Sequence, residues 1–566
     1  MLKAREVRNN GHSYSKLFTW GGFSRLFAGL FLALGLVAAL SLSFAQLASA
    51  SPLRPAGKNL DKTCAPEITI TAQESDHTYG AYQLFNGNVS DGKLTDISWG
   101  SGIDSDALLA ELKNGSIDEL KDVTSAPQLA EKLSKLESSK VIEFSKIATK
   151  HVTGTAKTFT KSGEAAPYSY KATLGEADHG YYLVKDTDEK AAALTSPILK
   201  VAGCTVTVEA KGSVPTSTKK IKEDSTGEWG DTADLDVGQE APFKLTGTMP
   251  SNIADFTTYK YGFKDFISKG FTLPEGFAAK DLTVKIGDKE ITPDTVNVTA
   301  ITDDTHGAEY NGGKQIEIMF TDLKATAKAA GVELTADSEV TVEYSATVND
   351  QAVIGGAGNP NKSLVVYQKD VNDGDGLGET PEDEVWAFTY QLDTTKVDSA
   401  DPETKLKDAQ FRLYNSDKSK SAKIENGKIS AWVDGDAGTV ITTPEGGIFN
   451  IAGLDADTYY LKEIKAPAGY NLPTGDDAYF KFVIAASLTV GDDGKGKIES
   501  LTITPGKAQA ADGDIPTGKV SMNIENTSGS TLPETGGIGT VIFTVVGLLV
   551  MAGAAGGFVW RRKQNS

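Results

Sequence analysis

The chain contains 566 residues, 23% of them charged, and its formal net charge at pH 7 is −20. A surface this acidic disfavours binding to nucleic acid and to anionic lipid, because both attract basic patches. The chain has only two cysteines and five scattered histidines. The sequence therefore offers no Cys/His cluster of the zinc type, and we expect neither a metal site nor a cofactor.

Residues 1–50 have the three parts of a secretory signal peptide. Five basic residues and one acidic residue precede the apolar stretch LFAGLFLALGLVAALSLSFA, and Ala48-Ser49-Ala50 follows. This order is typical of a cleaved leader, with an uncleaved membrane anchor as the alternative. Without this +4 region and the +3 tail beyond Thr535, the mature chain carries −27, which suits a self-repelling extracellular protein.

Residues 51–211 are predicted to form an N-terminal β domain with a small helical insert. Ile68 and Ile70 alternate with polar residues, as in a strand with one buried face. The later segment SAPQLAEKLSKL has leucines at helical spacing, with Ser125 as N-cap and Gln128 in the capping-box position.

Cys64 and Cys204 flank this first domain. An even cysteine pair in a secreted chain predicts one disulfide, which would tie the first strand region to the last. Two separate buried thiols are the alternative.

The rest of the mature chain is predicted to form two further β domains, at 212–384 and 385–527. Both contain short runs rich in Thr, Val and Ile, such as EVTVEYSATV, without the strand–helix alternation of a parallel fold. The prediction is a mainly β protein of tandem Ig-like sandwich domains. The segment DVNDGDGLGETPEDE has acids at EF-hand positions, but Leu377 occupies a ligand position and a strand follows, which favours a linker over calcium.

Residues 528–566 combine a short motif, an apolar segment and a basic end. The uncharged run Ile538–Trp560 is long enough to span a bilayer, and Arg561, Arg562 and Lys563 would keep the tail cytoplasmic. Such a span alone would be an ordinary membrane anchor. With LPETG upstream, the order resembles the cell-wall sorting signal of Gram-positive surface proteins, in which a sortase cleaves between Thr and Gly. The resemblance implies the recognition residues Leu532, Pro533, Glu534, Thr535 and Gly536.

Three segments of the third block, FTYQLDTTKVD, YYLKEIKAPAGYN and KVSMNIENTSG, resemble the first strand, the E-box and the last strand of Cna B-type pilin domains. The resemblance implies a self-formed isopeptide bond between Lys396 and Asn526, with Glu463 as the catalytic acid. The chemistry is reasonable, because burial disfavours both the ammonium and the carboxylate forms. A neutral amine can then attack an amide whose carbonyl is polarised by a protonated acid.

The second block resembles the middle domain of such pilins through VPTSTKKI, YGFKDFISKGFTL and VIGGAGNPNKSLVVYQ. The resemblance implies a second bond between Lys219 and Asn361 with Asp265 as the acid. Lys220 and Asn359 are alternatives, since neighbouring strand residues point to opposite faces. The first block has Lys185 where the E-box acid would be, so no isopeptide is expected there.

Between the first two blocks lies CTVTVEAKGSVPT. It occupies the place of the pilin motif of backbone pilins, whose lysine is the amine that a class C sortase uses. The matching residue is Lys211, with Glu209-Ala210 in place of the family's Tyr-Pro. An ordinary surface lysine is the alternative.

Together these features imply a backbone (major) pilin, a structural subunit rather than an enzyme. It would be secreted, chained covalently to identical subunits by sortases, and anchored to peptidoglycan as part of a fimbria that supports adhesion. Minor pilins and a host surface ligand would be further partners. The alternatives are a singly wall-anchored adhesin or minor pilin, and a wall-anchored hydrolase, for which the sequence has no catalytic motif.

Overall fold

The structure is a computed structural model that describes residues 65–564, except for 74, 76, 91–92, 176, 189–193, 195, 211, 506–509, 531 and 533–537. The predicted signal peptide, Cys64, Lys211 and the motif residues 533–536 lie outside the described residues.

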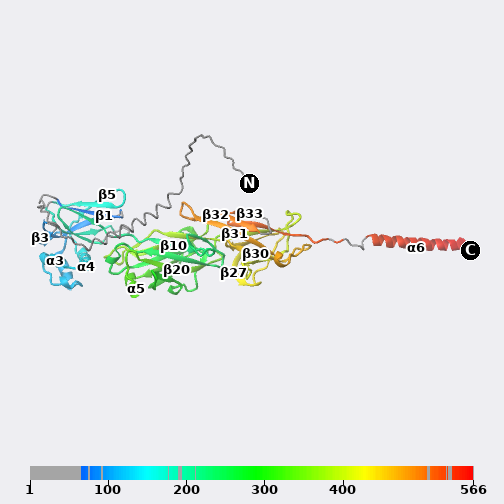
Figure 1. The fold of residues 1–566 in the computed structure, drawn as a ribbon, viewed down its shortest axis with the longest axis horizontal. Coiled ribbons are helices and arrows are strands. Elements are labelled where there is room, and N and C mark those ends of the chain that lie inside the picture. The colour runs from blue at the N-terminus through cyan, green and yellow to red at the C-terminus, as the bar shows by residue number, and fades with distance from the viewer. Residues whose placement is uncertain are drawn as a thin grey trace, which may run out of the picture. The chain divides into compact units, whose positions relative to one another are not determined.

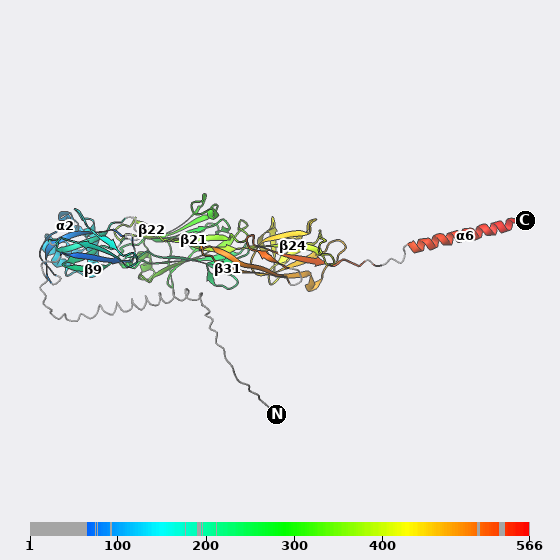
Figure 2. The ribbon, with the colours of Figure 1, turned by 90° about the horizontal axis from the view of Figure 1, so that it is seen from above.

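The N-terminal domain consists of two sheets (Figures 1 and 2). The first has the order β5-β6-β1-β9, and β1 and β9 are parallel neighbours that pair Glu67 with Thr205. The second has the order β3-β2-β7-β8, with β4 paired to β2. The strands are β1 (Glu67–Ala72), β2 (Tyr79–Ser90), β3 (Lys93–Trp99), β4 (Lys157–Thr158), β5 (Thr160–Ser162), β6 (Tyr168–Thr173), β7 (Gly180–Asp186), β8 (Ile198–Ala202) and β9 (Thr205–Glu209).

A helical segment separates β3 from β4, as the sequence predicted. It contains α2 (Ser105–Asn114), η2 (Asp118–Leu120), α3 (Ala126–Leu133) and α4 (Ser138–Thr149). Its apolar side chains form one buried cluster with Leu84 and Leu183 of the second sheet. Ser125 is the N-cap of α3 but makes no side-chain capping bond. The expected capping box is wrong in this detail, because the Gln128 side chain accepts the Thr124 backbone N–H at 3.0 Å instead.

The middle domain is a sandwich of two sheets. One has the order β11-β10-β13-β20-β16-β17 with β15 on β20, and the other β12-β23-β21-β14-β19-β18 with β22 on β21. The elements are β10 (Ser217–Lys222), β11 (Trp229–Gly230), β12 (Thr232–Asp234), β13 (Glu240–Thr248), η3 (Ile253–Asp255), β14 (Tyr261–Ile267), β15 (Phe271–Thr272), η4 (Ala279–Asp281), β16 (Thr283–Ile286), β17 (Lys289–Glu290), β18 (Thr295–Ala300), η5 (Ala308–Tyr310), β19 (Lys314–Phe320), α5 (Leu323–Ala329), β20 (Glu339–Val348), β21 (Asn359–Gln368), β22 (Leu377–Glu379) and β23 (Asp383–Phe388).

The C-terminal domain is one continuous sheet that follows the order β32-β31-β30-β25-β26-β27-β29-β24-β34-β33, with β28 on β25. Its first and last long strands, β24 and β34, are parallel neighbours. The elements are β24 (Tyr390–Asp398), β25 (Gln410–Tyr414), β26 (Lys420–Glu425), β27 (Lys428–Asp434), β28 (Ile441–Thr442), β29 (Ile448–Leu454), β30 (Thr458–Lys465), η6 (Gly475–Ala478), β31 (Tyr479–Val490), β32 (Gly496–Pro505), β33 (Ala510–Asp514) and β34 (Lys519–Asn526).

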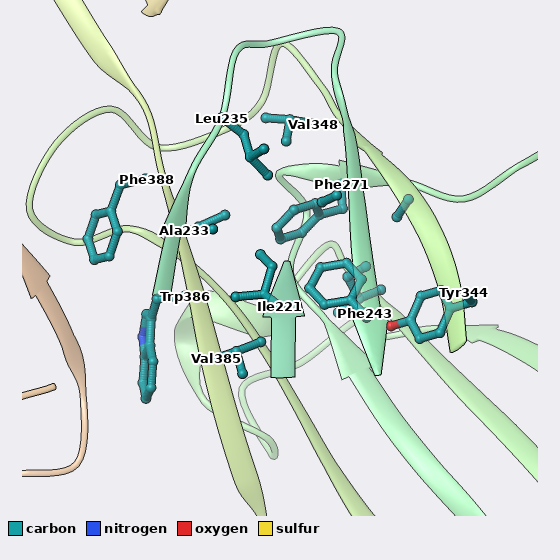
Figure 3. Close-up of a cluster of buried hydrophobic side chains, with 14 of the residues drawn as sticks. Ile221, Ala233, Leu235, Phe243, Phe271, Tyr344, Val348, Val385, Trp386 and Phe388 are labelled. Carbon is teal, nitrogen blue, oxygen red and sulfur yellow. The ribbon is translucent and has the colours of Figure 1, made fainter. Parts of the chain in front are cut away.

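Strand pairing differs from the expected border at 384/385. β23 crosses that border and pairs with β21 of the middle domain, and β22 occupies part of the expected linker. β23 pairs there because two of its apolar side chains, Val385 and Trp386, are buried in the core that also contains Ile221 (Figure 3). This core continues through Phe388 into the C-terminal domain, so the middle and C-terminal domains share one buried apolar cluster.

Buried carboxyl groups reinforce the joint between these two domains. Asp234, at the end of β12, accepts a hydrogen bond from the Tyr390 hydroxyl at 2.8 Å. Asp455, directly after β29, interacts with Asp234, and both side chains are buried. Burial, together with the neighbouring Asp234 carboxyl, raises the pKa of Asp455 well above its ordinary value. Burial likewise raises the pKa of Asp234, so the pair holds a proton that two exposed aspartates would have lost.

The joint should therefore weaken as the pH rises. The folded pair binds a proton more tightly than the unfolded chain does, so this contribution is complete below the ordinary aspartate pKa of about 4 and is lost as the pH rises through the raised values. Asp455→Asn keeps a neutral group at every pH. We expect the melting temperature of the mature chain to fall several degrees less between pH 5 and pH 8 in this variant than in the wild type.

The matched control is Asp434→Asn, which neutralises an exposed aspartate at the end of β27 in the same domain. It should keep the wild-type pH dependence. The melting temperatures are measured by differential scanning calorimetry. If they change equally with pH in all three proteins, the joint does not hold a shared proton.

Candidate functional site

Two clusters, each with a lysine, an acid and an asparagine, are buried in the middle and C-terminal domains. In the C-terminal domain, the β24 strand alternates buried and half-buried residues, which places Lys396 on the face of Tyr390, Leu392 and Thr394. In the middle domain, β10 buries Lys219 and Ile221 and leaves Lys220 half-exposed. Because alternate side chains of a strand point to the same face, each lysine points into the core with its apolar neighbours.

The C-terminal cluster joins three strands. Lys396 is fully buried on β24, Asn526 ends the neighbouring strand β34, and Glu463 lies on β30. The Lys396 ammonium donates to the carbonyl oxygen of Ile524 at 3.1 Å, two residues before Asn526. The Asn526 amide nitrogen donates to the carbonyl oxygen of Asn471 at 2.8 Å, which orients the amide.

Burial controls the protonation of this cluster. Desolvation lowers the pKa of Lys396, although the Glu463 and Glu525 charges oppose it. Desolvation raises the pKa of Glu463, against the opposing effects of Lys396 and of the Asn526 amide. Neither carboxyl oxygen of Glu463 nor the side-chain oxygen of Asn526 has a full hydrogen bond. Burial therefore shifts this cluster toward a neutral amine and a protonated acid, beside an amide oxygen that has no hydrogen-bond partner.

The middle cluster is more enclosed. Lys219, Asp265 and Asn361 are each 0% exposed, and the Lys219 Nζ lies 2.5 Å from the Asp265 Oδ2. Lys219 comes from one sheet of the sandwich, and the other two residues come from β14 and β21 of the opposite sheet. Desolvation lowers the pKa of Lys219 and raises that of Asp265, each against the attraction of the other.

The alternatives for the middle cluster have other partners. Lys220 forms an ion pair with Asp231 near the surface. Asn359 is buried, but its side-chain oxygen accepts the Val353 N–H at 2.8 Å and its nitrogen donates to the carbonyl oxygen of Val353 at 3.0 Å. The Asn361 oxygen, by contrast, has no hydrogen-bond partner. Lys219 is thus the lysine that contacts Asp265, and Asn361 is linked to the same acid through the Tyr344 hydroxyl.

Sequence reasoning missed one member of this cluster. Tyr344 on β20 donates a hydrogen bond to the Asp265 Oδ2 at 3.0 Å and accepts one from the Asn361 Nδ2 at 2.8 Å. The alternating pattern of EVTVEYSATV does indicate that Tyr344 faces the core. It does not indicate which buried groups the tyrosine meets, because these come from β14 and β21 of the opposite sheet.

Of the remaining predicted residues, the structure describes Cys204 and Leu532 but not Cys64 or residues 533–536. Cys204 is disulfide-bonded, directly before β9, and Cys64 lies outside the described residues. Leu532 is 83% exposed, and the other four LPETG residues lie outside the described residues. Beyond them, α6 (Ile538–Gln564) contains a segment, Val541–Gln564, that is long and apolar enough to cross a membrane, with a mean hydropathy of 2.2.

Comparison with known proteins agrees with these features. Residues 390–503 match the family of prealbumin-like fold domains, and residues 524–566 match the LPXTG cell wall anchor motif. The chain is 26% identical over 417 residues to the trypsin-resistant surface T6 protein of Streptococcus pyogenes serotype M6. That alignment covers 63% of this chain and 70% of the relative.

One solved structure shows the same fold. The T6 backbone pilin of serotype M6 Streptococcus pyogenes superposes with a TM-score of 0.50 at 18% identity, covering 83% of this chain and all of that one. The full-length major pilin SpaD from Corynebacterium diphtheriae has a TM-score of 0.45 at 15% identity, with 84% of this chain covered and all of that one. Over most of its length the chain is thus similar to a backbone pilin, and its LPXTG signal marks it as a surface protein anchored to the cell wall.

Proposed function

We propose that this chain is a backbone pilin with two internal isopeptide bonds, Lys219–Asn361 and Lys396–Asn526. A sortase would link Thr535 of one subunit covalently to Lys211 of the next. The burial of both lysines beside a carboxyl group and an amide with an unpaired oxygen carries the first part of this proposal. In each cluster the amine attacks the amide carbon, the acid transfers a proton, and ammonia leaves. No external enzyme is needed, so this catalysis acts only within the chain itself.

The position of each bond fits resistance to pulling. The C-terminal bond would join β24 to β34, the first and last long strands of that domain, which are parallel neighbours. The middle bond would join the two sheets of the sandwich through β10 and β21. Tension applied at the ends of either domain would then act on a covalent bond before it could separate the strands.

The first domain would use a disulfide for the same purpose. β1 and β9 are parallel neighbours, and the Glu67 backbone N–H donates to the carbonyl oxygen of Cys204 at 2.6 Å. Because the chain has only two cysteines, Cys64 is the partner that we propose for Cys204. This bond would tie the first strand region of the domain to the last.

The intersubunit link is supported by the position of Lys211 in the chain. β9 ends at Glu209, the Ala210 N–H still pairs with the carbonyl oxygen of Thr71, and β10 of the next domain begins at Ser217. Lys211 therefore follows directly on the last strand of the first domain. With the acyl donor at the C-terminus and the acceptor here, repeated transfer gives a linear fibre. The last subunit would be transferred to peptidoglycan, with minor pilins and a host ligand as further partners.

The C-terminal bond depends on Glu463. Glu463→Gln keeps the side-chain shape but cannot transfer a proton, so we expect intact-mass spectrometry to find the wild type two ammonias lighter than its sequence and the variant only one. Closing a loop this long stabilises the fold by roughly 4–5 kcal/mol, by analogy with disulfides. The variant should therefore melt about 10 °C lower. A wild-type mass with no ammonia lost would exclude both bonds.

The middle bond should discriminate between adjacent lysines. Lys219→Met removes the buried amine but keeps its apolar stem, and we expect this variant to retain one ammonia and to yield no branched peptide from the middle domain. Lys220→Met is the matched control and should crosslink fully, since Lys220 pairs with Asp231 near the surface. Crosslinking lost in the Lys220 variant and kept in the Lys219 variant would reverse the assignment.

Polymerisation should depend on Lys211. Lys211→Arg keeps the positive charge but removes the primary amine, so the ladder of covalent multimers on denaturing gels of wall extracts should disappear. The monomer should still be linked to the wall. Lys200→Arg, at an exposed position of β8, is the control and should polymerise normally, whereas deletion of 532–536 should abolish both polymer and wall linkage. A normal ladder from Lys211→Arg would identify another acceptor.

A further inference from the structure

A chain of hydrogen bonds crosses the middle cluster. It runs from the Lys219 Nζ to the Asp265 Oδ2 over 2.5 Å, from that oxygen to the Tyr344 hydroxyl over 3.0 Å, and from the hydroxyl to the Asn361 Nδ2 over 2.8 Å. Its two ends are the attacking nitrogen and the leaving nitrogen of the proposed crosslink. All four side chains are at most 4% exposed, so bulk water is excluded from the path.

We propose that Tyr344 is a catalytic residue of the middle crosslink, which carries a proton from Asp265 to the leaving nitrogen of Asn361. This inference rests on the proposed Lys219–Asn361 bond. Asp265 holds only one end of the path, since its Oδ2 meets Lys219 and Tyr344, and the Asn361 nitrogen is hydrogen-bonded to the tyrosine instead.

This relay accounts for every proton and bond in the reaction. The neutral Lys219 amine attacks the Asn361 Cγ and forms the new C–N bond, while Asp265 is protonated. After the attack the Asn361 Nδ2 is an amine with a lone pair, so the two hydrogen bonds of Tyr344 reverse. Asp265 then passes its proton to the Tyr344 oxygen as the Tyr344 proton moves to the Asn361 Nδ2. The Cγ–Nδ2 bond breaks, ammonia leaves, and Asp265 takes the surplus proton from the Lys219 nitrogen. Asp265 and Tyr344 end as they began.

A phenol suits this position because it donates and accepts a proton at the same oxygen. Burial raises the pKa of Tyr344 well above its ordinary value, as does the nearby Asp265 charge, so the hydroxyl keeps its proton until the reaction begins. The C-terminal cluster is built differently. There the Asn526 nitrogen donates to the Asn471 carbonyl, which has no proton to give, and Glu463 itself interacts with the Asn526 amide.

The ring of Tyr344 is held independently of its hydroxyl. It packs against Phe243 and Phe277, with ring centroids 5.3 and 5.8 Å away. Figure 3 shows the Tyr344 ring beside Phe243, with the Tyr344 oxygen on the side that faces Phe243. Tyr344→Phe should therefore keep the packing and remove only the proton carrier.

The test measures the rate of crosslinking in newly synthesised mature chain, by intact mass and by the yield of the branched middle peptide. We expect Tyr344→Phe to form the middle bond at least ~100-fold more slowly, the usual contribution of a general acid. The C-terminal bond of the same molecules should form at the wild-type rate. Tyr259→Phe is the matched control, since Tyr259 is equally buried in this domain and its hydroxyl has no partner there.

Two further comparisons separate chemistry from folding. Tyr344→Phe should melt at the same temperature as Lys219→Met, which lacks the same bond for another reason. If it melts lower, Tyr344→His, whose ring can donate and accept a proton, must crosslink faster than Tyr344→Phe. Equal rates for the His and Phe variants, or wild-type crosslinking in Tyr344→Phe, would overturn the relay. A wild type without the middle bond would instead contradict the crosslink itself.

Discussion

Desolvation of an amine beside a carboxyl group is the constraint on which this protein depends. In water, Lys219 and Asp265 or Lys396 and Glu463 would be fully charged, and neither amine would attack an amide. Inside a dry sandwich the charged forms are penalised, so each pair moves toward a neutral amine and a protonated acid. The same burial that is costly for an ion pair thus creates reactive groups, and the crosslink that we propose removes the buried charge permanently.

The two clusters lie at different places in their sheets. The middle cluster spans the gap between two sheets, so its bond would fasten the layers of the sandwich. The C-terminal cluster lies along neighbouring parallel strands, so its bond would fasten the chain ends of the domain. Because strand register places the lysine, the acid and the asparagine, the proposed crosslinks could form only after each domain has folded.

The domains are also linked to one another through buried polar contacts. The middle and C-terminal domains share an apolar core, and Asp234 and Asp455 meet across it. On the other side of the middle domain, Ser196 donates to the Asp255 carboxylate at 2.7 Å, and the Lys146 ammonium contacts the Asp255 carbonyl oxygen. Force passed along the chain therefore meets packed, hydrogen-bonded joints between domains whose interiors are held by the proposed crosslinks.

The sequence by itself determined the mainly β architecture, the helical insert, the sorting signal and the core-facing position of Lys396, because strand periodicity and short motifs are local properties. It left Lys220 and Asn359 as alternatives, since a one-residue shift changes the face and only register across strands decides it. The tertiary structure brought Asp265 to Lys219 and linked Asn361 to that acid through Tyr344, and it placed β23 in the middle domain, where Val385 and Trp386 are buried. Tyr344 and the Asp234–Asp455 joint could not be predicted, because their partners lie on other strands, 17 and 79 residues away in the case of Tyr344, and meet only when the sheets pack.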